Sequence, residues 1–314
     1  MVKGGVAAYL ARMSSELRLG FFCALAAYLF WGALPLYFRA LDHIAPGEML
    51  AHRIVWALPT GLLFIAIASR WREFRAAVTR RRLFYLGLSA SLIALNWLVY
   101  IWAVSQERVT EASLGYFINP LVSVLFGMFF FSEKLRPAQW IAIVIACIGV
   151  GILTWELGRL PWVSLILCFT FASYGAVRKK VSVDGRIGFA IETALLFPVA
   201  LIWLVWFQST PEGSWMGDRP VDVLLLPLAG PVTAVPLILF ALAAKRLKLS
   251  TIGMMQYIAP TLQFLIAVLI FREPFGTTKA IAFCFIWTAL AVFTTDSVMG
   301  DRKARRLARA AQLS

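Results

Sequence analysis

Residues Glu111–Leu135 read EASLGYFINPLVSVLFGMFFFSEKL, and this stretch decides how the chain is built. The run Ala112–Phe131 carries no charged side chain, so it lacks the polar face that a water-soluble helix exposes. Its length suits a bilayer crossing of roughly 20 residues. Pro120 lies near its middle, cannot donate a backbone hydrogen bond, and crowds the carbonyl of Tyr116. We therefore predict a transmembrane helix that breaks at its centre, with Tyr116 and Asn119 beside the break.

A second stretch of the same kind lies 140 residues further along the chain. In that register Pro120 matches Pro260, and Glu133 matches Glu273. Each stretch has proline near its middle and a Phe-x-Glu sequence at its end, which indicates an internal duplication. Interrupted spans in corresponding positions of two halves are the best sequence indication of a transporter's binding site. We therefore expect helix breaks at Pro120 and Pro260, with a substrate site near them.

Composition identifies the class of protein. Of the 314 residues, 61% are hydrophobic and 15% are charged, whereas soluble domains carry roughly 25% charged residues. The sequence has no phosphate-binding glycine loop, zinc motif or nucleophile elbow, and its four cysteines lie singly in apolar stretches. We therefore expect a multi-pass membrane protein that is not an enzyme and carries neither a metal nor another cofactor.

The predicted fold is all-α, with ten transmembrane helices arranged as two inverted five-helix repeats. The expected spans are at about 19–38, 47–69, 83–104, 112–131, 137–155, 160–177, 187–207, 222–244, 249–271 and 276–296. They form repeats at 19–156 and 157–297, between basic tails at 1–18 and 298–314. Because five is an odd number, the repeats have opposite orientations in the membrane, as in transporters with inverted repeats.

The positions of the charges predict which side faces the cytoplasm. Most of the 30 lysines and arginines lie in the tails and in loops that fall on one side of the predicted topology. The positive-inside rule then places both termini in the cytoplasm. This asymmetry, together with contact with anionic lipid headgroups, explains the net charge of +14 without nucleic acid.

Several motifs resemble those of a known family. They are His52-Arg53-Ile54-Val55-Trp56, Asn96-Trp97-Leu98, Glu111–Leu121, Gln256-Tyr257-Ile258 and Pro260-Thr261-Leu262. Over roughly residues 17–297 the chain resembles the RarD proteins, a branch of the EamA group in the drug/metabolite transporter superfamily. The resemblance implies a bacterial inner-membrane permease in which helices 1–4 and 6–9 surround a central cavity. RarD proteins are associated with chloramphenicol sensitivity, which leaves the physiological substrate open.

Charged residues inside the spans are candidates for the functional site. Glu48 and His52 lie four apart in the second span, so they share a helix face and can pair, and Arg53 follows directly. Ionisable groups in a span usually face a cavity or a partner, which favours a substrate or proton site at the outer mouth. The alternative is that Glu48 and Arg53 are interfacial and reach water.

Glu192, near the inner end of the seventh span, is a possible counterpart of the Glu48 region in the second repeat. Carboxylates at opposite mouths would suit proton-coupled exchange. The alternative is a structural hydrogen bond, or a pairing with Arg186 or Lys180.

Uncharged polar residues lie deeper in the predicted bundle. They are Asn96, Tyr116, Asn119, Gln256 and Tyr257. Amides and phenols offer hydrogen bonds without a fixed charge, which fits a cavity for a neutral or zwitterionic solute. The alternative is polar packing between helices, which is common in membranes.

One aromatic residue and the prolines complete the candidate set. Trp97, beside Asn96, is a candidate to stack on a flat solute. Pro120, Pro236 and Pro260 are candidate helix breaks or gates.

The function that fits best is a secondary transporter, expected to be an exporter, of small organic molecules, drugs or metabolites by alternating access. Amino-acid-like and amphenicol-like solutes are both candidate substrates. The alternative is a lipid or amphiphile carrier similar to a scramblase. Short loops argue against a receptor, and the sequence leaves a monomer and a homodimer open.

Overall fold

A computed structural model describes residues 2–106, 108–158, 161–210, 219–270, 272 and 276–313. Within these ranges the chain forms twelve α-helices. They are α1 (Val2–Ala40), α2 (Pro46–Ile67), α3 (Trp71–Ala77), α4 (Arg80–Ser105), α5 (Val109–Phe131), α6 (Pro137–Leu157), α7 (Trp162–Lys180), α8 (Gly185–Gln208), α9 (Asp222–Arg246), α10 (Leu249–Met255), α11 (Ile258–Leu269) and α12 (Thr277–Leu313).

The described structure contains fewer long apolar helices than the ten predicted spans. Eight helices in the described ranges are long and apolar enough to cross a bilayer, namely α1, α2, α4, α5, α6, α8, α9 and α12. The predicted spans 160–177 and 249–271 fall on α7 and on the pair α10 and α11. The α7 helix ends in three basic residues, and α10 and α11 are individually too short to cross.

The prediction of a break at Pro120 is wrong, because α5 is continuous through that residue. Proline removes one backbone donor, and a helix in a membrane can continue where neighbouring helices satisfy the backbone groups around it. A neighbouring segment contacts this part of α5, since the Tyr257 hydroxyl donates to the Phe117 carbonyl, three residues before Pro120, at 3.1 Å. One turn of α5 is therefore supported from outside rather than ended.

The interruption expected near Pro260 is present between α10 and α11. The first of these helices ends at Met255 and the second begins at Ile258. Pro260 lies in the first turn of α11, where a backbone N–H has no partner within the helix and its loss costs little. By contrast, α9 continues through Pro236, so no break occurs there.

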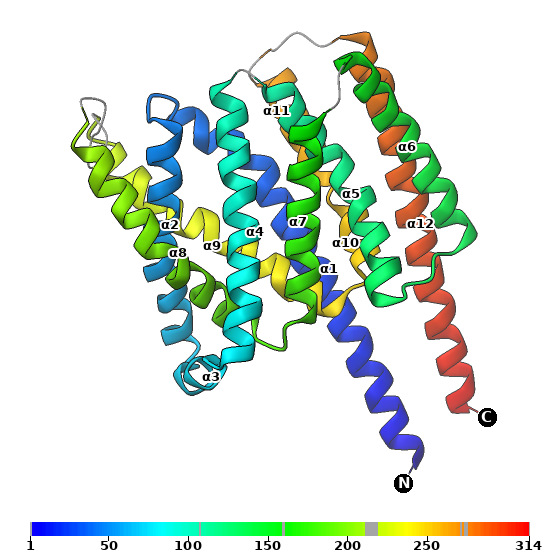
Figure 1. The fold of residues 1–314 in the computed structure, drawn as a ribbon. Helices are drawn as coiled ribbons and strands as arrows, with labels where there is room; N and C mark the ends of the chain where they lie inside the picture. The colour runs from blue at the N-terminus through cyan, green and yellow to red at the C-terminus, as the bar shows by residue number, and fades with distance from the viewer. Residues whose placement is uncertain are drawn as a thin grey trace.

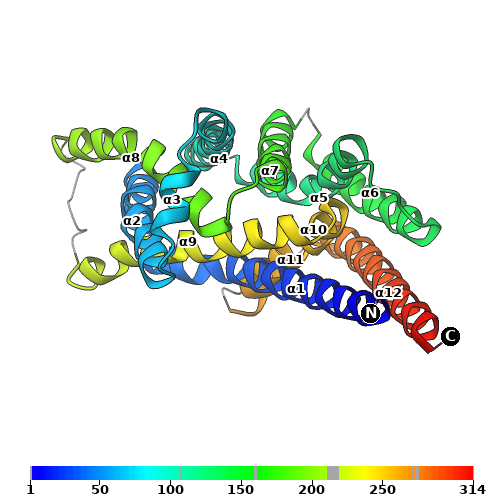
Figure 2. The same cartoon turned by 90° about the horizontal axis from the view of Figure 1, so that it is seen from below.

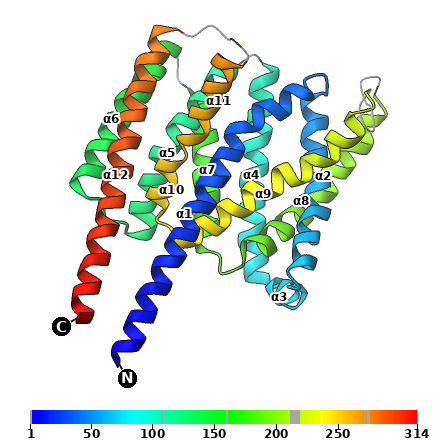
Figure 3. The ribbon, with the colours of Figure 1, turned by 180° about the vertical axis from the view of Figure 1, so that it is seen from behind.

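The helices pack in pairs that place the two sequence halves against each other. Along one edge of the bundle α6 lies beside α12, and along the opposite edge α2 lies beside α8 (Figure 1). Seen from below, α4 and α7 lie on one side of the bundle, and α1 and α9 lie on the other (Figure 2). From behind, α9 crosses the bundle obliquely beside α1 (Figure 3).

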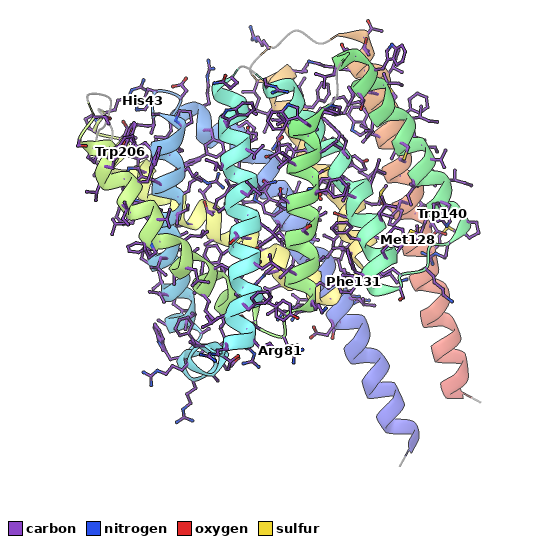
Figure 4. All side chains as sticks on the ribbon, viewed as in Figure 1. His43, Arg81, Met128, Phe131, Trp140 and Trp206 are labelled. Atoms are coloured by element: carbon purple, nitrogen blue, oxygen red, sulfur yellow. The ribbon has the colours of Figure 1, made fainter. Side chains whose placement is uncertain are left out.

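The two ends of the bundle differ in what projects from them. The beginning of α1 and the end of α12 project together from one end, and Arg81 lies at that same end (Figure 4). His43, between α1 and α2, lies at the opposite end. The flanks carry exposed apolar side chains such as Trp155, Phe129 and Ile202, which suits contact with lipid.

Candidate functional site

A cavity of about 190 Å³ lies inside the bundle, between α1, α2, α4, α5, α7, α9 and the region of α10 and α11. Its polar lining residues are Arg53, Asn96, Tyr100, Tyr116, Gln256 and Gln263. Aromatic side chains make up much of the remaining wall, among them Tyr28, Trp31, Phe38, Trp97 and Phe171. Phe38 is near the end of α1 and Arg53 near the start of α2, so the cavity lies toward the end of the bundle opposite the chain termini.

Arg53 is held in the cavity wall by contacts on two sides. Its Nε donates to the Thr233 hydroxyl of α9 at 3.1 Å. Its Cζ lies 4.7 Å from the centre of the Trp97 ring and 5.7 Å from that of Phe38. A guanidinium over an aromatic face gains electrostatic stabilisation that compensates in part for the loss of water. Thr233 and Trp97 together fix the plane of the guanidinium.

The amides around the cavity are oriented by the backbone and by α7. The Asn96 Nδ2 atom donates to the Leu167 carbonyl at 2.8 Å and to the Thr170 hydroxyl at 2.9 Å. Both of its N–H bonds are thereby used, which leaves Oδ1 as the acceptor available to a ligand. Gln263 donates from Nε2 to the Trp31 carbonyl at 3.1 Å. The remaining polar wall is the Tyr100–Tyr116 ring pair and Gln256, whose position at the helix interruption brings it to the cavity.

An aromatic cluster closes the side of the cavity toward the chain termini. Phe240 stacks on Tyr174 with ring centres 5.8 Å apart, and its ring centre lies 5.5 Å from that of Phe171 and 5.8 Å from that of Trp31. The Tyr28 hydroxyl donates to the Ile252 carbonyl at 3.0 Å. Tyr28 and Tyr174 are both almost fully buried, so the described residues of α1, α7, α9 and α10 pack closely here.

Glu48 and His52 lie close to each other, as the sequence spacing allows, but they do not line the cavity. The His52 Nε2 atom lies 3.8 Å from Glu48 Oε1, and both residues are about 2% exposed or less. An interfacial Glu48 that reaches water is therefore wrong for this structure. Successive residues of a helix point about 100° apart, so Arg53 can face the cavity while His52 faces away from it. The substrate or proton role of the pair stays a prediction.

Glu192 belongs to a separate buried network between α4, α7 and α8. Its Oε1 accepts from the Ser89 hydroxyl at 2.6 Å and lies 3.2 Å from Arg178 Nη1. The partner is thus Arg178, rather than either of the basic residues that the sequence suggested. A void of about 10 Å³ lies between Glu192 and Trp97, which also lines the main cavity. That void has room for about one water molecule.

Asn119 and Tyr257 lie outside the cavity wall. The Tyr257 hydroxyl is engaged with the Phe117 carbonyl, so this residue joins α5 to the interruption between α10 and α11. Asn119 is 1% exposed, and within the described structure neither of its amide atoms has a hydrogen-bond partner. The cavity-lining role predicted for these two residues does not fit this conformation.

Sequence reasoning missed two features. Gln263 follows Gln256 and Pro260 at helical spacing, and this periodicity was the signal that could have identified it. Glu133 accepts hydrogen bonds from the backbone nitrogens of Leu249 and Ser250, at 2.6 and 2.9 Å, and thereby caps the start of α10. The matching Glu273 lies outside the described residues.

Comparisons of the sequence with known proteins indicate one family. A model of the EamA-like transporter family matches residues 18–155. Protein RarD of Salmonella typhimurium is 44% identical over 292 residues, which cover 92% of this chain and 99% of that protein. An uncharacterized transporter of Vibrio cholerae is 43% identical over 91% of this chain and 95% of that protein. A solved crystal structure shares the fold, with a TM-score of 0.70 and 19% identity over 90% of this chain and 98% of that one.

Proposed function

Because the chain belongs to the RarD group of the EamA-like transporter family, we propose that it exports small organic molecules through the bundle by alternating access. It is a multi-span membrane transporter of the drug/metabolite type. The observation that carries the proposal is the cavity itself, which has polar groups and aromatic walls and is closed on one side by the cluster around Phe240. Closing the other side and opening this cluster would move a bound solute across.

The packing of the helices supports two five-helix repeats. The first repeat then consists of α1, α2, α4, α5 and α6. Its helices correspond, in that order, to α7, α8, α9, the pair α10 and α11, and α12 in the second repeat. The contact of α1 with α9 then corresponds to the contact of α7 with α4. In the same way, the contact of α1 with α11 corresponds to the contact of α7 with α5. The pairs α2 with α8, α5 with α10 and α6 with α12 join counterparts. Such an exchange of partners is expected for halves that are related by a twofold axis.

One hydrogen bond supports the same repeat at the level of residues. Tyr257 donates to Phe117, and the two residues are 140 apart, which is the offset found in the sequence. A direct contact between equivalent positions is expected where a twofold axis passes. With two inverted repeats, exchange of their conformations converts an outward-open state into an inward-open one. The ten crossings follow if α7 and the pair α10 and α11 also span the membrane.

The distribution of basic residues supports the orientation that the sequence predicts. Arg81 and both chain ends lie on the same side, which the positive-inside rule places in the cytoplasm of a bacterial cell (Figure 4). The cavity then lies in the outer half of the inner membrane, and the Phe240 cluster lies on its cytoplasmic side.

Thiol accessibility tests alternating access without knowledge of the substrate. A variant with Cys23, Cys147, Cys168 and Cys284 replaced would carry a single new cysteine, Ala259→Cys, in the cavity wall. A membrane-impermeant thiol reagent would be added to right-side-out and to inside-out vesicles. The proposal predicts labelling from both sides, because the cavity opens to each side in turn.

The matched control is Ala146→Cys, in the α6–α12 contact away from the cavity, and it should label from neither side. Labelling of the cavity cysteine from one side alone, whatever the conditions, would contradict alternating access.

A further inference from the structure

The charge of the cavity restricts the class of solute further than its shape does. Of the described residues that line it, Arg53 alone is charged. Within the part of the chain that the structure describes, no hydrogen bond or ion pair joins Arg53 to a carboxylate. Arg53 is partly buried, and a cation inside a membrane span is costly and is normally paired or engaged in function. Among the described residues, this fixed positive charge of the cavity therefore has no carboxylate counter-ion.

The two Nη atoms of Arg53 are suited to bind a carboxylate. Nε is used by Thr233, while no hydrogen bond from either Nη atom is present among the described residues. Arginine binds carboxylates with two parallel N–H···O bonds from its planar fork. Trp97 fixes the plane of that fork, so a ligand would meet donors that are already oriented.

The rest of the cavity suits a compact apolar body. Trp31, Phe171 and Tyr100 supply aromatic wall, and Asn96 and Gln263 supply amides. The volume of about 190 Å³ is below the roughly 300–1,000 Å³ of pockets for drug-sized ligands. A solute with one aromatic or branched aliphatic group is therefore favoured over a larger drug.

We propose, on the basis of the transport function above, that this cavity selects compact organic monoanions, with the carboxylate on Arg53 and the apolar body against the aromatic wall. An amine is rejected because it meets a like charge and, among the described lining residues, no acid. A zwitterion binds less well than the matching carboxylate, because no described lining residue offers a carboxylate to its ammonium group.

Net charge on the solute also determines what drives transport. The empty protein returns with its own charges unchanged, so each cycle moves the single negative charge of the solute. With the cell interior negative, 100 mV favours outward movement of that anion by a roughly 50-fold concentration ratio. Export then requires no coupled proton.

Four ligands that share a phenylpropyl body test the selectivity: 3-phenylpropionate, 3-phenylpropionamide, 3-phenylpropylamine and phenylalanine. Their binding to the purified full chain would be measured by calorimetry in detergent. We expect the carboxylate to bind at least about tenfold more tightly than the amide, since a hydrogen-bonded charge pair is worth about 1.5–3 kcal/mol. The amine should bind least.

Variants assign the selectivity to one residue. Arg53→Gln should remove the advantage of the carboxylate and retain binding of the amide, and Arg53→Lys should keep part of that advantage. Arg39→Gln, which alters an exposed arginine of the same region, should leave all four affinities unchanged. Equal affinity for amide and carboxylate, tightest binding of phenylalanine or of the amine, or binding of none of the four would overturn the inference. The thiol-accessibility result decides separately whether the transport proposal stands.

The driving force is tested with 3-phenylpropane-1-sulfonate, a permanent anion that crosses lipid slowly. Proteoliposomes loaded with it would be given an inside-negative potential with potassium and valinomycin. Efflux should accelerate relative to zero potential, and protein-free liposomes should show no such change. A rate of protein-mediated efflux that is the same with and without the potential would overturn electrogenic export.

Discussion

The guanidinium of Arg53 lies over the ring of Trp97, with its Cζ atom 4.7 Å from the ring centre. The two residues come from α2 and α4, so the contact joins helices that pack little elsewhere. Cation–π contacts are worth about 0.5–2 kcal/mol, with the larger values where water is excluded. Trp97→Leu should therefore weaken binding of 3-phenylpropionate by about 2- to 30-fold, measured by calorimetry, with a smaller change for 3-phenylpropionamide.

The contact of Phe117 with Tyr257 predicts a small and specific loss of stability. Tyr257→Phe removes the hydroxyl that donates to the Phe117 carbonyl beside Pro120. A buried hydrogen bond contributes about 0.5–1.5 kcal/mol, so the thermal midpoint in detergent should fall by a few degrees. Tyr85→Phe is the control, because within the described structure its hydroxyl has no hydrogen bond. Equal midpoints for the two variants would argue against support of α5 from the helix interruption.

The cap formed by Glu133 predicts a larger effect. Its carboxylate accepts from Leu249 N, Ser250 N and the Ser250 hydroxyl, at 2.6, 2.9 and 2.7 Å. Loss of a helix cap costs about 0.5–2 kcal/mol, and this carboxylate also faces Lys179 at 3.7 Å. Glu133→Ala should lower the thermal midpoint more than Glu133→Gln. Glu156→Ala, at an exposed position of α6, should not change it.

Substitution of Glu192 distinguishes a structural role of the Glu192–Arg178 pair from a role of Glu192 in proton transfer. Glu192→Gln leaves the 1%-exposed Arg178 without its counter-charge, and breaking a buried pair typically costs about 3–5 kcal/mol. We therefore expect poor thermal stability, with substantial recovery in the double variant Arg178→Leu with Glu192→Leu. A stable Glu192→Gln protein that transports but has lost its pH dependence would instead identify Glu192 as a proton carrier.

Asp184 predicts a pH dependence of stability at the start of α8. Burial acts to raise the pKa of this carboxylate, but hydrogen bonds from Arg186 and the charge of Arg70 outweigh it and lower the pKa below its usual range. The stabilisation is then present above the unfolded pKa of about 3.9 and is lost as the pH falls through the folded value. Asp184→Asn should lower the thermal midpoint at pH 7 and have a smaller effect toward pH 3. An equal loss at both pH values would contradict this.

The sequence predicted the class of fold because it depends on composition and on the lengths of apolar runs. It could not distinguish Pro120, inside a continuous helix, from Pro260, just after an interruption, since neighbouring helices decide whether the backbone around a proline is satisfied. Arg53 and Trp97 were identified because a charge and a tryptophan in a span are conspicuous. The rotation of α2 that directs Arg53 to the cavity and His52 away from it depends on packing.

Counterflow through reconstituted protein tests most directly whether this cavity is the binding site of a carrier. Proteoliposomes preloaded with unlabelled 3-phenylpropane-1-sulfonate would be diluted into a trace of the labelled compound at zero membrane potential. An alternating-access carrier should accumulate the label transiently above its equilibrium level, and Arg53→Gln should abolish this overshoot. Equilibration without overshoot in the unmodified protein, or an overshoot that survives in Arg53→Gln, would contradict a carrier that binds its solute on Arg53.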